Sequence, residues 1–220
     1  MKIGEIRGNK LPDMKSKLPD RAYSEYDNFA FHPYNIMLML VLAAITILFL
    51  GLSAAFVYTR VQGGMGAVKI PWLFGFNTLI LLGSSYTMFR AKKAYLNDET
   101  RVYQNCLIAT IALTLLFLVM QFVAWSQLFI INIFPESDNS AGYLYLLSGL
   151  HFAHVLAGLP FLAKFLLRSK MQMIDPVTVL VYFSDPEKRL RLRLLSIYWH
   201  FLDGLWIFLV IFLLVNQLIG

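Results

Sequence analysis

Long apolar runs, separated by short polar segments, dominate the chain. Five segments contain no Asp, Glu, Lys or Arg except for a single acid, Asp203: residues 28–59, 70–89, 102–135, 139–163 and 194–220. Each reaches the roughly 20 residues that a helix needs to cross about 30 Å of hydrocarbon. We therefore expect five membrane-spanning helices, at about 35–58, 70–90, 103–128, 142–166 and 186–217.

The apolar pattern favours helices over the strands of a membrane barrel. Barrel strands alternate between apolar and polar residues with a period of two, whereas residues 38–50 are apolar without any such alternation. Helices satisfy all their backbone hydrogen bonds internally, as lipid requires. The predicted fold is an all-α integral membrane protein, with a charged cytoplasmic N-terminal tail over 1–33 and a single five-helix membrane domain over 34–220.

The linker between the fourth and fifth predicted helices, residues 168–193, contains two local signals. An apolar strip lies at 177–183, and the run Ser184-Asp185-Pro186-Glu187 follows it. A capping residue, a proline in the first helical position and an acid in the first turn are typical of a helix start. We expect the last helix to begin near Pro186, before the membrane.

Composition and charge agree with a membrane protein and assign it an orientation. Apolar residues make up 58% of the chain and charged residues 15%, against about 45 to 50% and about 25% in ordinary globular domains. Of the 19 Lys and Arg, 17 lie on the tail, the second loop and the fourth loop, and only Arg60 and Lys69 lie on the other side. Because basic loops stay in the cytoplasm, the N-terminus is expected inside and the C-terminus outside. Topology and anionic lipid account for the net charge of +6, so nucleic acid is not an expected partner.

Four ionisable residues inside the predicted spans are the candidate chemical groups. His151 and His154 lie three residues apart on the fourth helix, and His200 and Asp203 have the same spacing on the fifth, so each pair shares a helix face. A charge near the bilayer centre costs on the order of 3 kcal/mol. A rise of 1.5 Å per residue places His154 and Asp203 at similar depths, about 15 and 14 Å, but His151 and His200 at about 20 and 9 Å. A four-ligand metal site is therefore disfavoured, and the one cysteine, Cys106, excludes a site made of several thiolates.

Two interpretations of these groups stay open. In one, His154, His200 and Asp203 form a hydrogen-bonded cluster that sets the register of the helices and contacts a lipid headgroup. In the other, they form a proton-relay or lipid-regulated site, since intramembrane acids are often functional. Small residues on the fourth helix, Gly149 and Ala153, predict a close helix contact. Interhelical hydrogen bonds are expected from polar residues elsewhere in the spans, namely Asn77, Ser84, Ser85 and Gln121.

Sequence motifs occur in four of the five predicted spans. Residues 198–208 read YWHFLDGLWIF, similar to a YWHFxDxxWxF signature that includes Trp199 and Trp206. Residues 148–155 are similar to TGxHxxHV, with both histidines present. The second span matches P…NTxxLLxSS at Pro71, Asn77, Thr78, Ser84 and Ser85, and the third has Gln121. In these motifs the sequence resembles subunit III of the haem-copper terminal oxidases, in its short five-helix bacterial form. One departure is Ile45, where the family commonly has glutamate.

The resemblance implies an arrangement and a set of partners. It implies two groups of helices separated by a lipid-filled cleft, docking against oxidase subunits I and II, and a structural phospholipid. It implies no cofactor, metal or catalytic residue in this chain, because haem and copper belong to the partner subunits. The expected location is the bacterial inner membrane, and a larger respiratory supercomplex with a cytochrome c reductase is a further possible assembly.

The resemblance also implies a function. The complex would be a proton-pumping cytochrome c oxidase of aerobic respiration that reduces O2 to water, and this chain would support the stability, proton uptake and oxygen access of subunit I. Two alternatives stay open: the equivalent subunit of a quinol oxidase or nitric oxide reductase, and a stand-alone membrane transporter that uses His154, His200 and Asp203.

Overall fold

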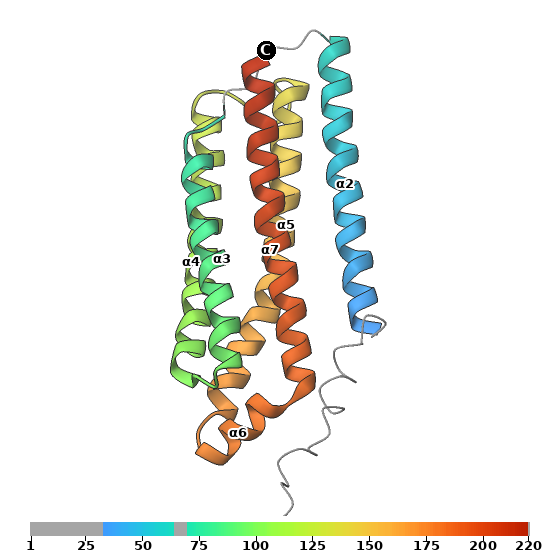
Figure 1. Ribbon diagram of the computed structural model, residues 1–220. Helices are drawn as coiled ribbons and strands as arrows, with labels where there is room; N and C mark the ends of the chain where they lie inside the picture. Colours follow the sequence, from blue (N-terminus) through green and yellow to red (C-terminus); the bar gives the residue numbers. More distant parts are fainter. Residues whose placement is uncertain (1–32, 64–69, 220) are drawn as a thin grey trace, which may run out of the picture.

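The computed structural model describes residues 33–63 and 70–219, and every regular element in these two ranges is a helix. The predicted tail therefore lies almost entirely outside the described residues. Figure 1 shows the helices, which are α2 (Pro33–Gly63), α3 (Leu73–Leu96), α4 (Thr100–Ile130), α5 (Asn139–Gln172), α6 (Pro176–Ser184) and α7 (Pro186–Ile219).

Four of these helices have the length and composition of membrane spans, namely α2, α4, α5 and α7. Each has 31 to 34 residues, or about 45 to 50 Å at 1.5 Å per residue, enough for the hydrocarbon and the headgroup layers. The shorter α3, with 24 residues, carries basic residues in its last turns, including Lys93, and does not belong to this set. An all-α membrane protein is confirmed for these four helices, and the fifth span stays a prediction.

The helices form a bundle in which α7 is central. It packs against α3, α5 and α2, while α3 and α4 lie side by side and α4 also contacts α5. One hydrophobic cluster surrounds Phe117 and Trp206 between α3, α4, α5 and α7. A second surrounds Tyr95, Tyr103 and Tyr182 at the end of the bundle near α6. The lipid-filled cleft and the orientation in the membrane stay predictions.

The connection between α5 and α7 contains the short helix α6, where the sequence indicated only an apolar strip in a linker. The backbone N–H of Asp175 donates to Thr178 Oγ1 at 3.2 Å, which caps the start of α6. The last helix, α7, begins at Pro186, and the Asp185 Oδ1 accepts the backbone N–H of Glu187 at 3.0 Å. Both helix starts thus follow from local capping chemistry.

Candidate functional site

Helices α3 and α7 are joined by three side-chain hydrogen bonds at two levels. The bonds are Trp206 Nε1 to Thr78 Oγ1 at 3.1 Å, Trp199 Nε1 to Ser84 Oγ at 3.1 Å, and Ser85 Oγ with His200 Nδ1 at 2.7 Å. The step of six residues from Thr78 to Ser84 on α3 is matched by a step of seven from Trp206 back to Trp199 on α7. Both steps are close to two helical turns, so the antiparallel helices keep one register along their contact.

A second set of polar contacts joins α3 to α4. They are Asn77 Nδ2 to Gln121 Oε1 at 2.9 Å, Ser84 Oγ with Thr114 Oγ1 at 3.5 Å, and Thr87 Oγ1 with Thr110 Oγ1 at 2.8 Å. Asn77, Ser84 and Gln121 are fully buried. The structure therefore confirms an interhelical role for these residues, and Ser84 contacts both α4 and α7.

His200 and Asp203 share a polar neighbour on α3. The Ser85 Oγ lies 2.7 Å from the His200 Nδ1, and the Ser85 side chain also lies near the Asp203 carboxyl group. Asp203 is 5% exposed, and its Oδ2 has no hydrogen-bond partner among the described residues. The structure thus brings one predicted pair together through a serine.

His154 lies in a different place, which changes the predicted cluster. Its Nδ1 bonds to the Leu150 carbonyl of its own helix at 2.7 Å, and its ring meets the edge of Phe49 on α2, with centroids 5.9 Å apart. Similar depth did not bring it to Asp203, because depth leaves the rotation of α5 about its axis undetermined. The predicted hydrogen-bonded group of His154, His200 and Asp203 is therefore corrected to Ser85, His200 and Asp203.

His151 is fully buried among aromatic rings. Its centroid lies 5.0 Å from that of Trp206 and 5.9 Å from that of Phe117. Neither ring nitrogen has a hydrogen-bond partner in the described part of the chain. Over the same described ranges, no three His, Cys, Asp or Glu residues lie close enough to hold a metal ion. His151 therefore packs in the core, apart from the other three candidate groups.

The close helix contact involves a glycine that the sequence pattern did not identify. A Cβ at Gly158 would lie 3.0 Å from Tyr198 Cε1 and 3.1 Å from Trp199 Cζ3, whereas one at Gly149 would meet nothing within 4 Å. No described residue of this chain therefore comes close to Gly149, and the close contact lies at Gly158 instead. Gly158 lies two turns after His151 on the same face of α5. This spacing in the sequence could have identified Gly158 as a residue of the helix contact.

Aromatic residues close the end of the bundle near α6. Tyr95 Oη donates to the Tyr182 carbonyl at 3.1 Å, and the Tyr95 ring meets that of Phe183 with centroids 5.1 Å apart. Burial raises the pKa of both Tyr95 and Tyr182 above the usual phenol value, so both stay neutral hydrogen-bonding groups.

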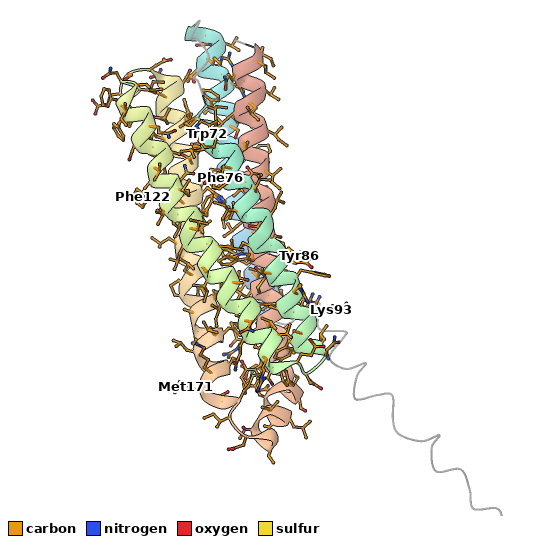
Figure 2. The ribbon with its side chains drawn as sticks, turned by 90° about the vertical axis from the view of Figure 1, so that its left-hand side faces the viewer. Trp72, Phe76, Tyr86, Lys93, Phe122 and Met171 are labelled. Carbon is orange, nitrogen blue, oxygen red and sulfur yellow. The ribbon has the colours of Figure 1, made fainter. Side chains whose placement is uncertain are left out.

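The outer surface contrasts with this polar interior. Figure 2 shows Phe76 on α3 and Phe122 on α4 among the outward side chains, and these are 42% and 56% exposed. An apolar exterior around buried, hydrogen-bonded polar groups is the arrangement of a helical membrane protein.

Fold and site thus define a class, a multi-span membrane protein whose helices are joined by buried polar side chains. A family model described as cytochrome c oxidase subunit III matches residues 34–216, almost all of the described part. The chain belongs to the cytochrome c oxidase subunit III family.

Individual relatives agree with this family. A protein of Synechocystis sp. named cytochrome c oxidase subunit 3 is 27% identical over 205 residues, covering 91% of this chain and 81% of the relative. Proteins of the same name from Rhizopus stolonifer and Neurospora crassa are 34% and 32% identical over 144 and 136 residues. These matches cover 65% and 61% of this chain and 45% of each fungal protein, so the chain spans about half their length.

Proposed function

We propose that this chain is the non-catalytic subunit III of an aerobic, proton-pumping cytochrome c oxidase. The observation that carries the proposal is the family match over residues 34–216, which includes all four helices with the character of membrane spans. In this assembly subunits I and II hold the haem and copper and reduce O2 to water. This chain stabilises subunit I and shapes its proton uptake and oxygen access.

The hydrogen bonds of the motif residues favour a structural role for this chain. Thr78, Ser84 and Trp206 each hydrogen-bond to another helix of the same chain. Helices in lipid associate through packing and such bonds, because lipid tails are as apolar as the helix surfaces. The motif thus maintains a rigid α3–α4–α7 unit, on which a docking face for subunit I can form.

Asp203 is the group through which we expect the subunit to interact with its surroundings. Buried polar atoms in proteins almost always have a partner, and the Asp203 Oδ2 has none among the described residues. In the assembled oxidase the donor would come from subunit I, a phospholipid or an ordered water. Such a donor would give Ser85, His200 and Asp203 the lipid-related or proton-related role that we propose for them. We further propose that α3 is the fifth span and that the protein lies in a bacterial inner membrane.

Purification from native membranes tests the function. The chain, carrying an affinity tag, is isolated in mild detergent, and we expect polypeptides that contain haem and copper to accompany it and to consume O2 with reduced cytochrome c. A tagged membrane protein of unrelated family is the control. Recovery of the chain without haem proteins would contradict the proposal, and O2 consumption with quinol only would favour the quinol oxidase alternative.

A further inference from the structure

Helix α6 has apolar side chains on two opposite faces, although it connects two membrane spans. Tyr182 and Phe183 are 2% and 8% exposed and pack on the aromatic cluster of Tyr95 and Tyr103. Val177, Leu180 and Val181 are 72%, 65% and 64% exposed. These percentages separate an inner face, already occupied, from an outer face that no described residue covers.

Helical periodicity places the three outer residues together. At about 100° per residue, Val177, Leu180 and Val181 fall within an arc of about 100°, and Tyr182 and Phe183 point to the opposite side. The exposed residues thus form one continuous apolar face, which we call the outer face of α6. An apolar face of this kind indicates an interaction surface.

The stretch that leads from α5 into α6 also exposes apolar side chains. The end of α5 and the connection to α6 expose Leu167, Met171 and Ile174 at 59%, 73% and 75%, and Figure 2 shows Met171 at this end of the molecule. Exposed polar and charged residues alternate with them, namely Arg168, Lys170, Gln172 and Asp175. Exposed apolar and basic side chains thus occur together on the way into α6, which is the composition of a helix segment at the headgroup layer. Lipid is therefore the occupant that this mixture favours.

The position of α6 agrees with the headgroup layer. Its last residue, Ser184, comes ten residues before Leu194, where the charge-free run on α7 resumes apart from Asp203. The part of α7 from Pro186 to Leu194 rises about 12 Å. A helix with its side chains is about 10 Å wide, so the nearer side of α6 lies about 7 Å from the hydrocarbon edge, at the outer part of a headgroup layer about 5 to 7 Å thick.

Basic residues surround α6 in excess over acids. Lys188 and Arg191 pair with Asp185 and Glu187. In the part of the chain that the structure describes, no ion pair involves a second set of exposed basic residues, namely Arg168, Lys170, Arg189 and Arg193. Two of this set, Arg168 and Arg189, lie close enough to the aromatic cluster to act electrostatically on Tyr182 and Tyr95. Such charges favour an anionic surface over a neutral one.

We propose that α6 is an interfacial anchor. Its outer face lies in the headgroup layer of the leaflet at this end of the bundle, and Arg168 and Arg189 bind anionic phospholipid headgroups. This surface is separate from the Ser85, His200 and Asp203 group and does not depend on membership of an oxidase.

Spin labels on the full-length chain test the position of the outer face. In a Cys106→Ser background, Val177→Cys and Val181→Cys carry a nitroxide, and Asn97→Cys, in the exposed α3–α4 turn, is the control. In nanodiscs of phosphatidylcholine and phosphatidylglycerol, we expect collisions with O2, which partitions into lipid, to exceed those with a water-soluble nickel chelate severalfold at residues 177 and 181. The ratio should reverse at residue 97.

Two results would overturn the anchor. Access of the nickel chelate to residues 177 and 181, at the level of residue 97, would place the outer face in water. Protection from both O2 and nickel would show that another protein segment covers it. Both results can be obtained whether or not the chain co-purifies with haem proteins, so the test is distinct from that of the proposed function.

Charge substitutions test the second half of the proposal. Arg168→Gln and Arg189→Gln should each weaken phosphatidylglycerol binding about fivefold, measured by native mass spectrometry of the full chain. The control is Arg101→Gln, at the same end but on α4. Equal losses at all three positions would show only a general charge effect and would contradict a headgroup site at α6, as would no loss at all.

Discussion

The α3–α7 interface and the contacts of α2 hold helices together in different ways. Between α3 and α7, Trp199 and Trp206 are 2% and 1% exposed, and each donates a hydrogen bond across the interface. On α2 the buried residues form one narrow stripe, consisting of Ile45, Phe49, Ser53 and Phe56. The opposite side is open, with Ile47 71% exposed. Hydrogen bonds from Arg60 to Asn216 join the last turn of α2 to α7.

The difference shows which part of the molecule sets the register. Hydrogen bonds have defined directions, so those between α3 and α7 admit one alignment. The apolar stripe of α2 can shift with little cost except at the last turn, where Arg60 bonds to Asn216. We infer that α3, α4 and α7 form the rigid part and that α2 is held less firmly. Substitutions in the two regions should therefore differ in how much stability they remove and in how many helices they affect.

The largest expected effect is that of Trp199→Ala. It removes a buried ring packed against Gly158 and the donor to Ser84, and we expect the free energy of unfolding to fall by roughly 3 to 5 kcal/mol. Steric trapping in bicelles measures this quantity. The control, Trp72→Ala, alters a side chain that is 74% exposed and should change stability little. Similar losses for both variants would contradict the contrast between interior and exterior.

Gly158→Ala should have the next largest effect. The new methyl group would press on the Tyr198 and Trp199 rings at 3.0 and 3.1 Å, and overpacking of this kind costs about 1 to 3 kcal/mol. Gly149→Ala, with open space around the new Cβ, should gain helix propensity of roughly 0.5 to 1 kcal/mol. Thermal unfolding in the same detergent compares the two, and equal signs would refute the assignment of the contact to Gly158.

Ser85→Ala tests the hydrogen-bonded group on α7. It leaves the His200 Nδ1 without the 2.7 Å contact, and we expect a loss of about 1 kcal/mol in the free energy of unfolding. The matched control is Ser126→Ala, whose hydroxyl bonds only the Phe122 carbonyl of its own helix and is exposed. If both serines behave alike, the Ser85 contact does not stabilise the bundle.

Ile45→Val should have the smallest effect, confined to α2. Ile45 is 5% exposed and packs with Leu147, Leu205 and Leu209, and loss of one methyl group costs about 0.5 kcal/mol at the low end of the usual range. Hydrogen exchange should show faster opening of α2 with no change in α3 and α7. Ile47→Val, on the exposed side of α2, should leave both unchanged. Faster exchange throughout the bundle would show that α2 belongs to the rigid part.

Helix positions were largely predictable, and their ends were less so. The predicted spans coincide with α2, α3, α4, α5 and α7, but α5 continues to Gln172 where charge counting suggested about 166. Charged side chains end a hydrocarbon span without ending a helix, because they are solvated in the headgroup layer. Helix α6 was missed, since nine residues form a helix only when packing stabilises it, here through Tyr182 and Phe183.

Part of the candidate site was also predictable. The polar residues of the spans were identified as interhelical because lipid leaves them no other partner, and Asn77 with Gln121 bears this out. Their pairings were not predictable, since a partner lies on another helix at a distance in sequence. Similar depths in the membrane therefore favoured His154 as the neighbour of Asp203, whereas in the structure the neighbour is Ser85.

The sequence by itself determined that the chain forms long apolar helices, and its motifs indicated the family, because hydropathy and motif spacing are local properties. Only the tertiary structure decided that Ser85 joins His200 and Asp203, that His151 packs against Trp206, and that Gly158 is the point of close approach. These contacts depend on which helices are neighbours and how each is rotated about its axis. Packing of the whole bundle sets both, and no single segment contains that information.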